Sequence, residues 1–334
     1  MDKMESTRDQ LIQLLAENGD AYISGQALSD SIGISRNAIW KQMKELEKDG
    51  YQIEAKPRVG YRITEFPDKL SSNTLKWGLD TAWLGKTILH HPTVDSTQAI
   101  GHQAAREGGP HGTIIVADEQ TGGRGRMNRS WHSAKGKGMW LSIILRPKIL
   151  PNHAAQLTLL TATVLADVLD KYDSVKPFIK WPNDILINEK KAAGILTEMQ
   201  AEQDQIQYIL IGIGLNVNQT RDDLHEDIQS KATSLRIESG NELSIKNLIQ
   251  ELLIAFEASF DKYMEQGFLP IKKKWESYGF KIGEEIAIKT FKDYWRAPFH
   301  GISEDGALCT ETEEGKPISL YSAEIEWFND TNRE

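Results

Sequence analysis

Cysteine is almost missing from this 334-residue chain, which contains only Cys309. A single thiol cannot form an internal disulfide, and chains that fold without disulfides belong to reducing compartments. The sequence also lacks the run of about 18 apolar residues that a membrane helix needs, and its first residues lack the apolar stretch of a signal peptide. We therefore expect a soluble, cytoplasmic protein with no membrane partner, large enough for two or three domains.

Two common nucleotide-binding patterns are absent as well. The sequence contains no Gly-x-x-x-x-Gly-Lys-Ser/Thr phosphate loop, and no Gly-x-Gly-x-x-Gly that opens a helix. No cluster of carboxylates suggests a dedicated metal cage, so we assign no metal ligands. The net charge of −9 argues against nonspecific binding of polyanions by the whole chain, so positive charge must be sought segment by segment.

Positive charge is concentrated in one glycine-rich stretch. Residues 119–131 carry glycine at 122, 123 and 125 and arginine at 124, 126 and 129. Glycine lets the backbone approach a ligand closely, and arginine offers permanent charge with forked donors that match carboxylate and phosphate. This pattern predicts an anion-binding loop, although such stretches also occur as solvated surface loops. A second charged cluster, Lys-Trp-Pro-Asn-Asp, follows at 180–184.

The N-terminal segment has the pattern of three short helices. Residues 7–18 place apolar side chains at helical spacing before Gly19, and a second helix is expected to begin near Ser24. Gly33 ends that helix, and Ser35 is placed to cap a third one. The buried face of the third helix is expected to carry Ile39, Met43 and Leu46.

A β-hairpin is expected at 51–63, because alternating residues flank a turn that contains proline and glycine. Between residues 36 and 62 there are seven Lys or Arg against four Asp or Glu, whereas the first 35 residues are acidic. These features are typical of a winged helix-turn-helix domain, whose third helix enters the major groove and whose wing touches phosphates. The candidates for DNA contact are Arg36, Asn37, Trp40, Lys41, Lys44, Lys56 and Arg58. An alternative is a bundle that only mediates protein contacts.

The rest of the chain mixes strand and helix patterns. Apolar runs predict strands at 113–117, 139–145, 178–180, 185–187 and 208–213. Helical periodicity predicts long helices at 154–172 and about 245–266. Short alternating runs at 285–290, 295–302, 307–310 and 318–325, separated by glycines, predict a small β-barrel. The expected fold class is therefore multidomain α+β.

Five motifs then agree with one family. The chain contains, in this order, Asp-Ser-Thr-Gln at 95–98, the Gly/Arg loop at 120–131, Lys-Trp-Pro-Asn-Asp at 180–184, Lys-Ala-Ala-Gly-Ile at 191–195 and Gly-Ile-Gly-Leu-Asn at 212–216. Their order and spacing resemble those of the biotin protein ligases. With the N-terminal head, the chain resembles along nearly its whole length the bifunctional members that also repress the biotin operon.

The resemblance implies a domain organisation that periodicity alone does not give. It implies a winged helix-turn-helix domain at 1–65, a biotin- and ATP-binding catalytic domain at 66–272 and an SH3-like β-barrel domain at 273–334. It also implies that the central mixed sheet is related to that of the class II aminoacyl-tRNA synthetases.

The activity implied by the resemblance is a two-step acyl transfer. Biotin and ATP, with Mg²⁺, give biotinoyl-5′-AMP and pyrophosphate, and a carrier lysine then accepts the biotinoyl group. The implied carriers are the biotin carboxyl carrier protein of acetyl-CoA carboxylase and other biotin-dependent carboxylases. The other implied partners are operator DNA and a second copy of the chain, in a homodimer that biotinoyl-AMP promotes. Neither step requires a covalent enzyme intermediate, which suits a chain without an evident nucleophile.

The resemblance also implies which residues act. Lys191 would bridge the biotin carboxylate and the α-phosphate, and Asp184 would orient or deprotonate the carrier lysine, with Arg124 and Arg126 completing the catalytic set. The residues implied in biotin binding are Ser96, Thr97, Gln98, Gln120, Arg124, Gly125, Arg126, Lys191 and Gly194. The residues implied in binding ATP or the adenylate are Arg126, Trp131, Lys180, Asn183 and Asn216.

Two positions depart from the family pattern. Gln98 stands where asparagine is usual, and Asn128 stands where glycine is common. Asparagine tolerates a left-handed backbone better than most residues, so we expect Asn128 to keep the turn. Three alternatives stay open: a ligand-sensing repressor without catalysis, a ligase for lipoate or another cofactor, and a biotin ligase whose head no longer represses.

Overall fold

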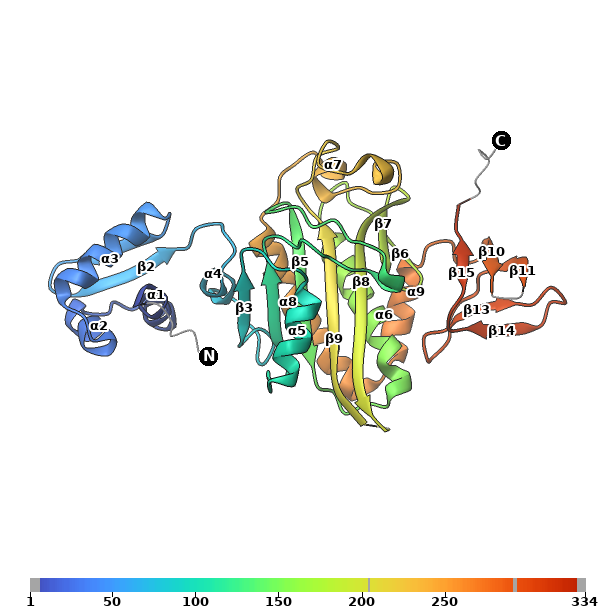
Figure 1. Ribbon diagram of the computed structural model, residues 1–334, viewed down its shortest axis with the longest axis horizontal. Coiled ribbons are helices and arrows are strands. Elements are labelled where there is room, and N and C mark those ends of the chain that lie inside the picture. The colour runs from blue at the N-terminus through green and yellow to red at the C-terminus, as the bar shows by residue number, and fades with distance from the viewer. Residues whose placement is uncertain (1–6, 204, 291–292, 329–334) are drawn as a thin grey trace. The chain divides into compact units, whose positions relative to one another are not determined.

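The computed structural model of the chain describes residues 7–203, 205–290 and 293–328. The chain divides into two compact units, Met1–Asp80 and Thr81–Glu334. Figure 1 shows the helices and strands that make up each unit. Within the described ranges, no helix combines the length and the apolar character needed to cross a bilayer.

The N-terminal unit contains the three expected helices, α1 (Thr7–Glu17), α2 (Gly25–Ile32) and α3 (Arg36–Lys48). Local chemistry sets their ends as predicted. Ser24 Oγ accepts a hydrogen bond from the N–H of Ala27 at 3.0 Å, and Ser35 Oγ accepts one from the N–H of Ala38 at 3.2 Å. Gly33, between the two helices, has the left-handed backbone of a helix C-cap. The helix-turn-helix therefore follows from capping residues in the sequence.

The hairpin and an extra helix complete this unit. Strands β1 (Gln52–Lys56) and β2 (Gly60–Glu65) form the predicted antiparallel hairpin, and α4 (Ser72–Lys76) contacts α1. The core includes apolar side chains that are at most 1% exposed, among them Leu11, Leu15, Leu28, Ile39, Met43, Leu46 and Ile63. The buried face of α3 is therefore the predicted one.

The larger unit is built on a seven-stranded sheet with the order β3-β4-β5-β9-β8-β7-β6. Its strands are β3 (Ile88–His91), β4 (Thr113–Ala117), β5 (Gly138–Leu145), β6 (Pro177–Lys180), β7 (Asp184–Ile187), β8 (Lys190–Glu202) and β9 (Gln205–Asn216). The pair β3/β4 is parallel and the other neighbouring pairs are antiparallel, so the sheet is mixed. All five predicted strands are present, whereas β3 and β8 were not expected.

Helices cover both faces of this sheet, as Figure 1 shows. Helix α5 (Thr97–Arg106) packs on β4, β5 and β9 on one face, and the other face carries α6 (Ala154–Leu169), α8 (Ile245–Gln266) and α9 (Leu269–Tyr278). Helix α6 is buried nearly all round because it lies between the sheet and α8 and α9. The bounds of α8 are those predicted, while α6 ends at Leu169 instead of residue 172. The shorter elements are α7 (Leu235–Ser239), η1 (Arg126–Asn128), η2 (Pro151–His153) and η3 (Glu226–Ile228).

The C-terminal part is β-rich, as predicted. One antiparallel sheet holds β11 (Tyr294–Pro298), β10 (Glu285–Lys289) and β15 (Glu324–Glu326), and a second holds β12 (Gly301–Ile302), β13 (Leu308–Glu311) and β14 (Pro317–Leu320). The predicted runs at 295–302 and 318–325 are therefore each divided into two strands. These strands are tied to the central sheet, because the indole N–H of Trp181 donates to the carbonyl oxygen of Gly306 at 3.1 Å.

A buried carboxylate ties α8 to the start of the larger unit. Glu257, which is 8% exposed, accepts hydrogen bonds from the backbone N–H groups of Ala82, Trp83 and Leu84 at 2.5, 2.8 and 2.7 Å. Burial acts to raise the pKa of this carboxyl group, but the three donors outweigh it and hold the pKa below its ordinary value. The folded state therefore favours the ionised form.

Glu257→Gln should lower the free energy of unfolding at pH 7 by about 2–3 kcal/mol, because the buried N–H groups lose a charged acceptor. The pKa of Glu257 is lower in the folded state than in the unfolded state. The ionised side chain therefore stabilises the fold fully when the pH is above the ordinary glutamate pKa, and this stabilisation is lost as the pH falls through the folded-state pKa. The stabilities of wild type and variant in urea unfolding should therefore converge as the pH falls below the ordinary range of a glutamate carboxyl group. The control is Glu265→Gln, at an exposed position of the same helix. If both variants were equally stable at pH 7, the role assigned to Glu257 would be wrong.

Candidate functional site

Three glycines on one face of the sheet form the floor of the candidate site. Gly194 on β8 is paired with Gly214 on β9, and Gly212 lies two residues earlier on the same face of β9. A Cβ atom at Gly214 would lie 2.6 Å from the Trp131 indole, and one at Gly194 would lie 3.1 Å from it. The indole therefore rests directly on bare backbone: a side chain at Gly214 would collide with it, and one at Gly194 would crowd it.

Lys191 and Asp184 meet beside this indole. The Lys191 Nζ atom lies 5.2 Å from the centroid of the Trp131 ring and 2.7 Å from Asp184 Oδ1. The side chains are 36% and 15% exposed, so the pair is partly screened from water. Asp184 is opposite Gly194 in the pairing of β7 with β8, which explains how the two motifs that contain them come together. The site thus holds a lysine whose partner is a single carboxylate.

More positive charge surrounds this carboxylate. Burial lowers the pKa of Lys180. The charges of Lys191 and Arg129 lower this pKa further, whereas the charge of Asp184 raises it. Burial also lowers the pKa of Arg126, again against the attraction of Asp184. Four cationic side chains therefore act on one another around one carboxylate. Such a surplus of positive charge suits an anionic ligand.

The Gly/Arg loop is held by its own backbone. The N–H of Gly125 donates to the carbonyl oxygen of Arg129 at 2.7 Å, and Arg126 Nη1 donates to Asn183 Oδ1 at 3.2 Å. The Arg124 side chain is exposed. The turn expected around Asn128 is present, and its left-handed residue is Met127, with φ +55°. The backbone places its positive φ one residue earlier, and the Met127 side chain is 85% exposed there.

Hydroxyl and amide groups converge at the first turn of α5. Ser96 is the N-cap of α5, and Thr97 donates from its backbone N–H to Gln120 Oε1 at 2.8 Å. Gln120 Nε2 in turn donates to Ser133 Oγ at 2.8 Å, and Ser142 Oγ donates to Thr97 Oγ1 at 2.8 Å. Alternating donors and acceptors of this kind suit a small polar ring such as a cyclic urea.

Sequence reasoning missed Ser133 and Ser142. Both are buried, at 3% and 0% exposure. Ser142 carried a signal, because it is the one polar residue in the apolar run 139–145. Ser133 carried none, since it lies in an irregular segment beyond Trp131.

Asn216 is differently placed from the other predicted residues. It is 6% exposed, its Nδ2 donates to the carbonyl oxygen of Thr233 at 2.9 Å, and its Oδ1 accepts from Gln219 Nε2 at 3.1 Å. Its amide is therefore engaged at both ends by the protein itself. Asn216 thereby holds the segment around Thr233. This segment pairs with the strand of Lys191, because the backbone N–H of Lys191 donates to the carbonyl oxygen of Lys231.

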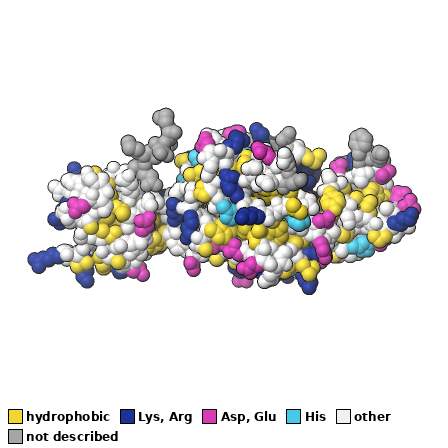
Figure 2. Space-filling model, turned by 90° about the horizontal axis from the view of Figure 1, so that it is seen from below, with side chains coloured by type: hydrophobic (Ala, Val, Ile, Leu, Met, Phe, Trp, Pro, Cys, Tyr) yellow, Lys and Arg dark blue, Asp and Glu magenta, His cyan; other side chains and the backbone are white. Residues whose placement is uncertain are grey.

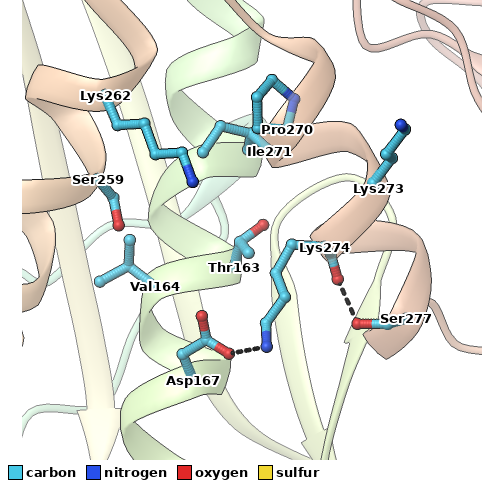
Figure 3. Close-up of a pocket in the computed structure, with 10 residues that line it drawn as sticks. All are labelled: Thr163, Val164, Asp167, Ser259, Lys262, Pro270, Ile271, Lys273, Lys274 and Ser277. Atoms are coloured by element: carbon cyan, nitrogen blue, oxygen red, sulfur yellow. Dashed lines mark hydrogen bonds and ion pairs between the residues drawn. The ribbon is translucent and has the colours of Figure 1, made fainter. Parts of the chain in front are cut away.

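A cavity of about 470 Å³ lies on the opposite face of the sheet, between α6, α8 and α9. Figure 3 shows its lining, where Lys274 reaches Asp167 at 3.0 Å. Tyr278 also donates to this carboxylate, at 2.7 Å. None of the predicted site residues lines this cavity. The candidate site is therefore separate from this cavity.

The residues predicted to touch DNA lie on the surface of the N-terminal unit. Arg36, Asn37 and Lys41 are exposed on α3, and Trp40 is 52% exposed. Lys44 is exposed too, but its Nζ pairs with Glu47 at 2.6 Å. Lys56 and Arg58 are exposed on the hairpin, where Arg58 adopts φ +65°. On the face seen in Figure 2, basic and acidic side chains are interspersed.

The described side chains offer few clustered metal ligands. Among the residues that the structure describes, no group of three or more His, Cys, Asp or Glu side chains lies close enough to hold a metal ion. The donor set therefore does not fit a metal ion held by protein ligands alone.

Two family matches define the class of protein. Residues 91–216 match the biotin/lipoate A/B protein ligase family, and residues 7–62 match an HTH domain. Together with the mixed sheet and its cationic site, they define a cofactor–protein ligase that carries a helix-turn-helix head.

Individual relatives narrow this class. The chain is 45% identical over 324 residues to the bifunctional ligase/repressor BirA of Bacillus subtilis (strain 168), covering 97% of this chain and 99% of that protein. It is 30% identical over 325 residues to BirA of Escherichia coli (strain K12), covering 94% and 97%. The structure of the biotin protein ligase from Aquifex aeolicus in complex with biotin and ATP matches with a TM-score of 0.63 and 32% identity, covering 72% of this chain and 98% of that one. The chain therefore belongs to the biotin protein ligase family, in the group of bifunctional ligase/repressors.

Gly214→Ala should displace Trp131 from the sheet, because the added methyl group would lie 2.6 Å from the indole. Overpacking of this kind costs about 1–3 kcal/mol, so we expect affinity for biotin or ATP to fall by about tenfold or more. Gly194→Ala, with its 3.1 Å contact, should have a smaller effect. Titration calorimetry with each ligand measures both variants. The reverse ranking, at equal thermal stability, would refute the proposed floor.

Proposed function

We propose that the protein activates biotin with ATP to give biotinoyl-5′-AMP, transfers the biotinoyl group to a carrier lysine, and represses genes of biotin biosynthesis or transport when the adenylate is bound. The observation that carries the proposal is the Lys191–Asp184 ion pair beside Trp131 within a cationic cluster, in a chain of this family. The carrier is the biotin carboxyl carrier protein of acetyl-CoA carboxylase, or that of another biotin-dependent carboxylase.

Biotin is proposed to lie with its cyclic urea at the first turn of α5. Ser96, Thr97, Gln98 and Gln120 would offer it donors and acceptors, and Gly194 would let its ring approach the sheet. This placement is supported by the buried hydrogen-bond chain through Thr97 and Gln120. It directs the biotin carboxylate towards the cationic cluster at the other end of the glycine floor.

In the first step, a carboxylate oxygen of biotin attacks the α-phosphorus of ATP. A new P–O bond forms, the bond to the β-phosphate breaks, and pyrophosphate leaves with the electron pair. Both reactants are anions, so positive charge must stand between them. Lys191 is suited to this task, because it can exchange Asp184 for the two incoming anions. Lys180 and Arg126 share the added negative charge.

In the second step, the amine of the carrier lysine attacks the acyl carbon and AMP leaves. The attacking nitrogen must lose a proton, and Asp184, released from Lys191, is the carboxylate at hand. The Arg124–Arg126 segment would fold over the mixed anhydride and exclude water. Trp131 would stack on the adenine, Asn183 would hold Arg126, and Asn216 would act indirectly because its amide is engaged.

Mg²⁺ is expected to accompany the phosphates of ATP and to neutralise part of their charge. Because the described side chains include no metal cage, we assign it no protein ligands and no separate step.

The domain assignment is part of the same proposal. We assign DNA binding to 1–65, catalysis to 66–272, and an SH3-like barrel to 273–334, which the two three-stranded antiparallel sheets support. A relationship of the central sheet to the class II aminoacyl-tRNA synthetases fits its mixed topology. A cytoplasmic location fits a chain with one cysteine.

Repression is proposed to require a homodimer that biotinoyl-AMP promotes. Linkage demands that the adenylate bind the dimer-competent state more tightly than the monomer. The dimer would place two helix-turn-helix heads on two operator half-sites, and the carrier would compete with the second copy for the same surface.

Lys191→Ala should abolish biotin-dependent exchange of labelled pyrophosphate into ATP, with a loss of about 100-fold or more, because a buried anion pair loses its bridging charge. The matched control is Lys190→Ala, which removes a neighbouring lysine of the same strand and should retain activity. Exchange that survives in Lys191→Ala would refute the assigned role. No exchange by the wild type with biotin would favour a sensor without catalysis, and exchange with lipoate instead would favour the other ligase class.

Lys41→Ala and Arg58→Ala should each weaken operator binding and reduce the slope of log affinity against log salt by about one, if each side chain neutralises a phosphate. The control is Lys48→Ala, whose ammonium pairs with Glu45 at 2.7 Å in the last turn of α3. Fluorescence anisotropy with adenylate-loaded protein gives the slopes. Equal slopes for all three variants and the wild type would exclude these contacts.

A further inference from the structure

The amide of Gln98 is held in one orientation by two acceptors. Gln98 is 7% exposed, and its Nε2 donates to Glu198 Oε2 at 2.9 Å and approaches the carbonyl oxygen of Leu196 at 3.4 Å. A carboxylate and a carbonyl group can only accept hydrogen bonds. If the amide turned over, its oxygen would face both of them. The nitrogen of Gln98 must therefore point towards β8.

This orientation leaves the carbonyl oxygen of the amide unmatched. Gln98 Oε1 is buried and has no hydrogen-bond partner in the part of the chain that the structure describes. It lies over Gly212, where a Cβ atom would stand 3.0 Å away from it. A buried acceptor without a donor carries a free-energy penalty. A ligand N–H group that donated to this oxygen would remove the penalty, which would add to the affinity for the ligand. The residue next to it in sequence is Thr97, at the proposed urea site.

Glu198 is itself held in place by a second row of side chains. Its Oε2 lies 3.1 Å from His102 Nε2, and His102 Nδ1 lies 3.0 Å from the hydroxyl group of Tyr208. Because Glu198 only accepts, His102 must donate from Nε2, which fixes its tautomer. The Arg146 guanidinium lies 5.8 Å from the Tyr208 ring and completes the row. Glu198 therefore has a defined position although its side chain is 44% exposed.

We propose that Glu198 is a positioning residue for biotin. It fixes the Gln98 amide so that Oε1 is presented as an unmatched acceptor, which an N–H group of the cyclic urea completes. Glutamine suits this role better than asparagine, because its extra methylene group carries the amide from α5 to β8. The inference rests on the proposed function, and it adds a residue outside all five sequence motifs.

The test is the kinetics of pyrophosphate exchange by the full-length Glu198→Gln variant. An amide at 198 can donate as well as accept, so the Gln98 amide is no longer fixed. We expect the KM for biotin to rise by about tenfold, with kcat and the KM for ATP within about twofold of wild type, as for a loss of binding alone. Glu202→Gln, which makes the same change at an exposed position of β8, should leave all three unchanged.

The double variant Gln98→Glu/Glu198→Gln distinguishes a loss of amide positioning from a general loss of stability. In it the amide at 198 can donate to the carboxylate at 98, whose second oxygen still serves as the unmatched acceptor. We expect the KM for biotin to recover to within about threefold of wild type, while Gln98→Glu alone, with two facing carboxylates, should be the weakest binder. Recovery supports the proposal even if Glu198→Gln alone proves too unstable to assay.

Two results would overturn the proposal. One is an unchanged KM for biotin in Glu198→Gln, and the other is a double variant no better than Gln98→Glu. A failure of the proposed function looks different, because the wild type itself would then show no biotin-dependent exchange.

Discussion

The candidate site depends on the absence of side chains at Gly194, Gly212 and Gly214. These positions lie side by side on β8 and β9, and they open a strip of bare backbone on the α5 face of the sheet. Trp131 rests on one end of the strip and the Gln98 amide on the other. The polar end and the cationic end of the site are therefore held on one rigid surface, although their residues come from five separate motifs. Rigid strands position such groups more accurately than loops can.

Charge is distributed unevenly along this strip. Asp184 faces several cations, and burial already disfavours the charged forms of Lys180 and Arg126. Without a bound anion these groups repel one another, so part of the electrostatic energy of the site is unfavourable. An anionic ligand relieves this repulsion while it gains its own contacts. In the same arrangement Lys191 is paired with a carboxylate while its side chain stays 36% exposed.

Much of the fold and of the candidate site could be predicted because it depends on residues that are close together in the sequence. Serines at helix starts, apolar strand runs and the motif order gave the helix-turn-helix, five of the seven central strands and most of the residues that meet at the site. Strand β8 was missed because its residues 190–202 mix lysine, glycine and glutamate without alternation. The turn of the Gly/Arg loop was expected, but the position of its positive φ at Met127 does not follow from residue propensity. The engagement of Asn216 by Thr233 and Gln219 depends on contacts that only the folded chain makes.

The hydrogen bond from Trp181 to Gly306 limits which C-terminal segments could replace the native one in a chimeric protein. Trp181 belongs to the cationic motif, while Gly306 lies in the turn before β13, and a Cβ atom at Gly306 would meet Leu159 at 2.7 Å. The tryptophan of the Lys-Trp-Pro-Asn-Asp motif is thus held in part by the last segment of the chain. A chimera that took its C-terminal strands from another family member would keep this hydrogen bond and this close packing only if it reproduced the turn at Gly306. Sequence segments that look interchangeable therefore share contacts that a junction between them would have to preserve.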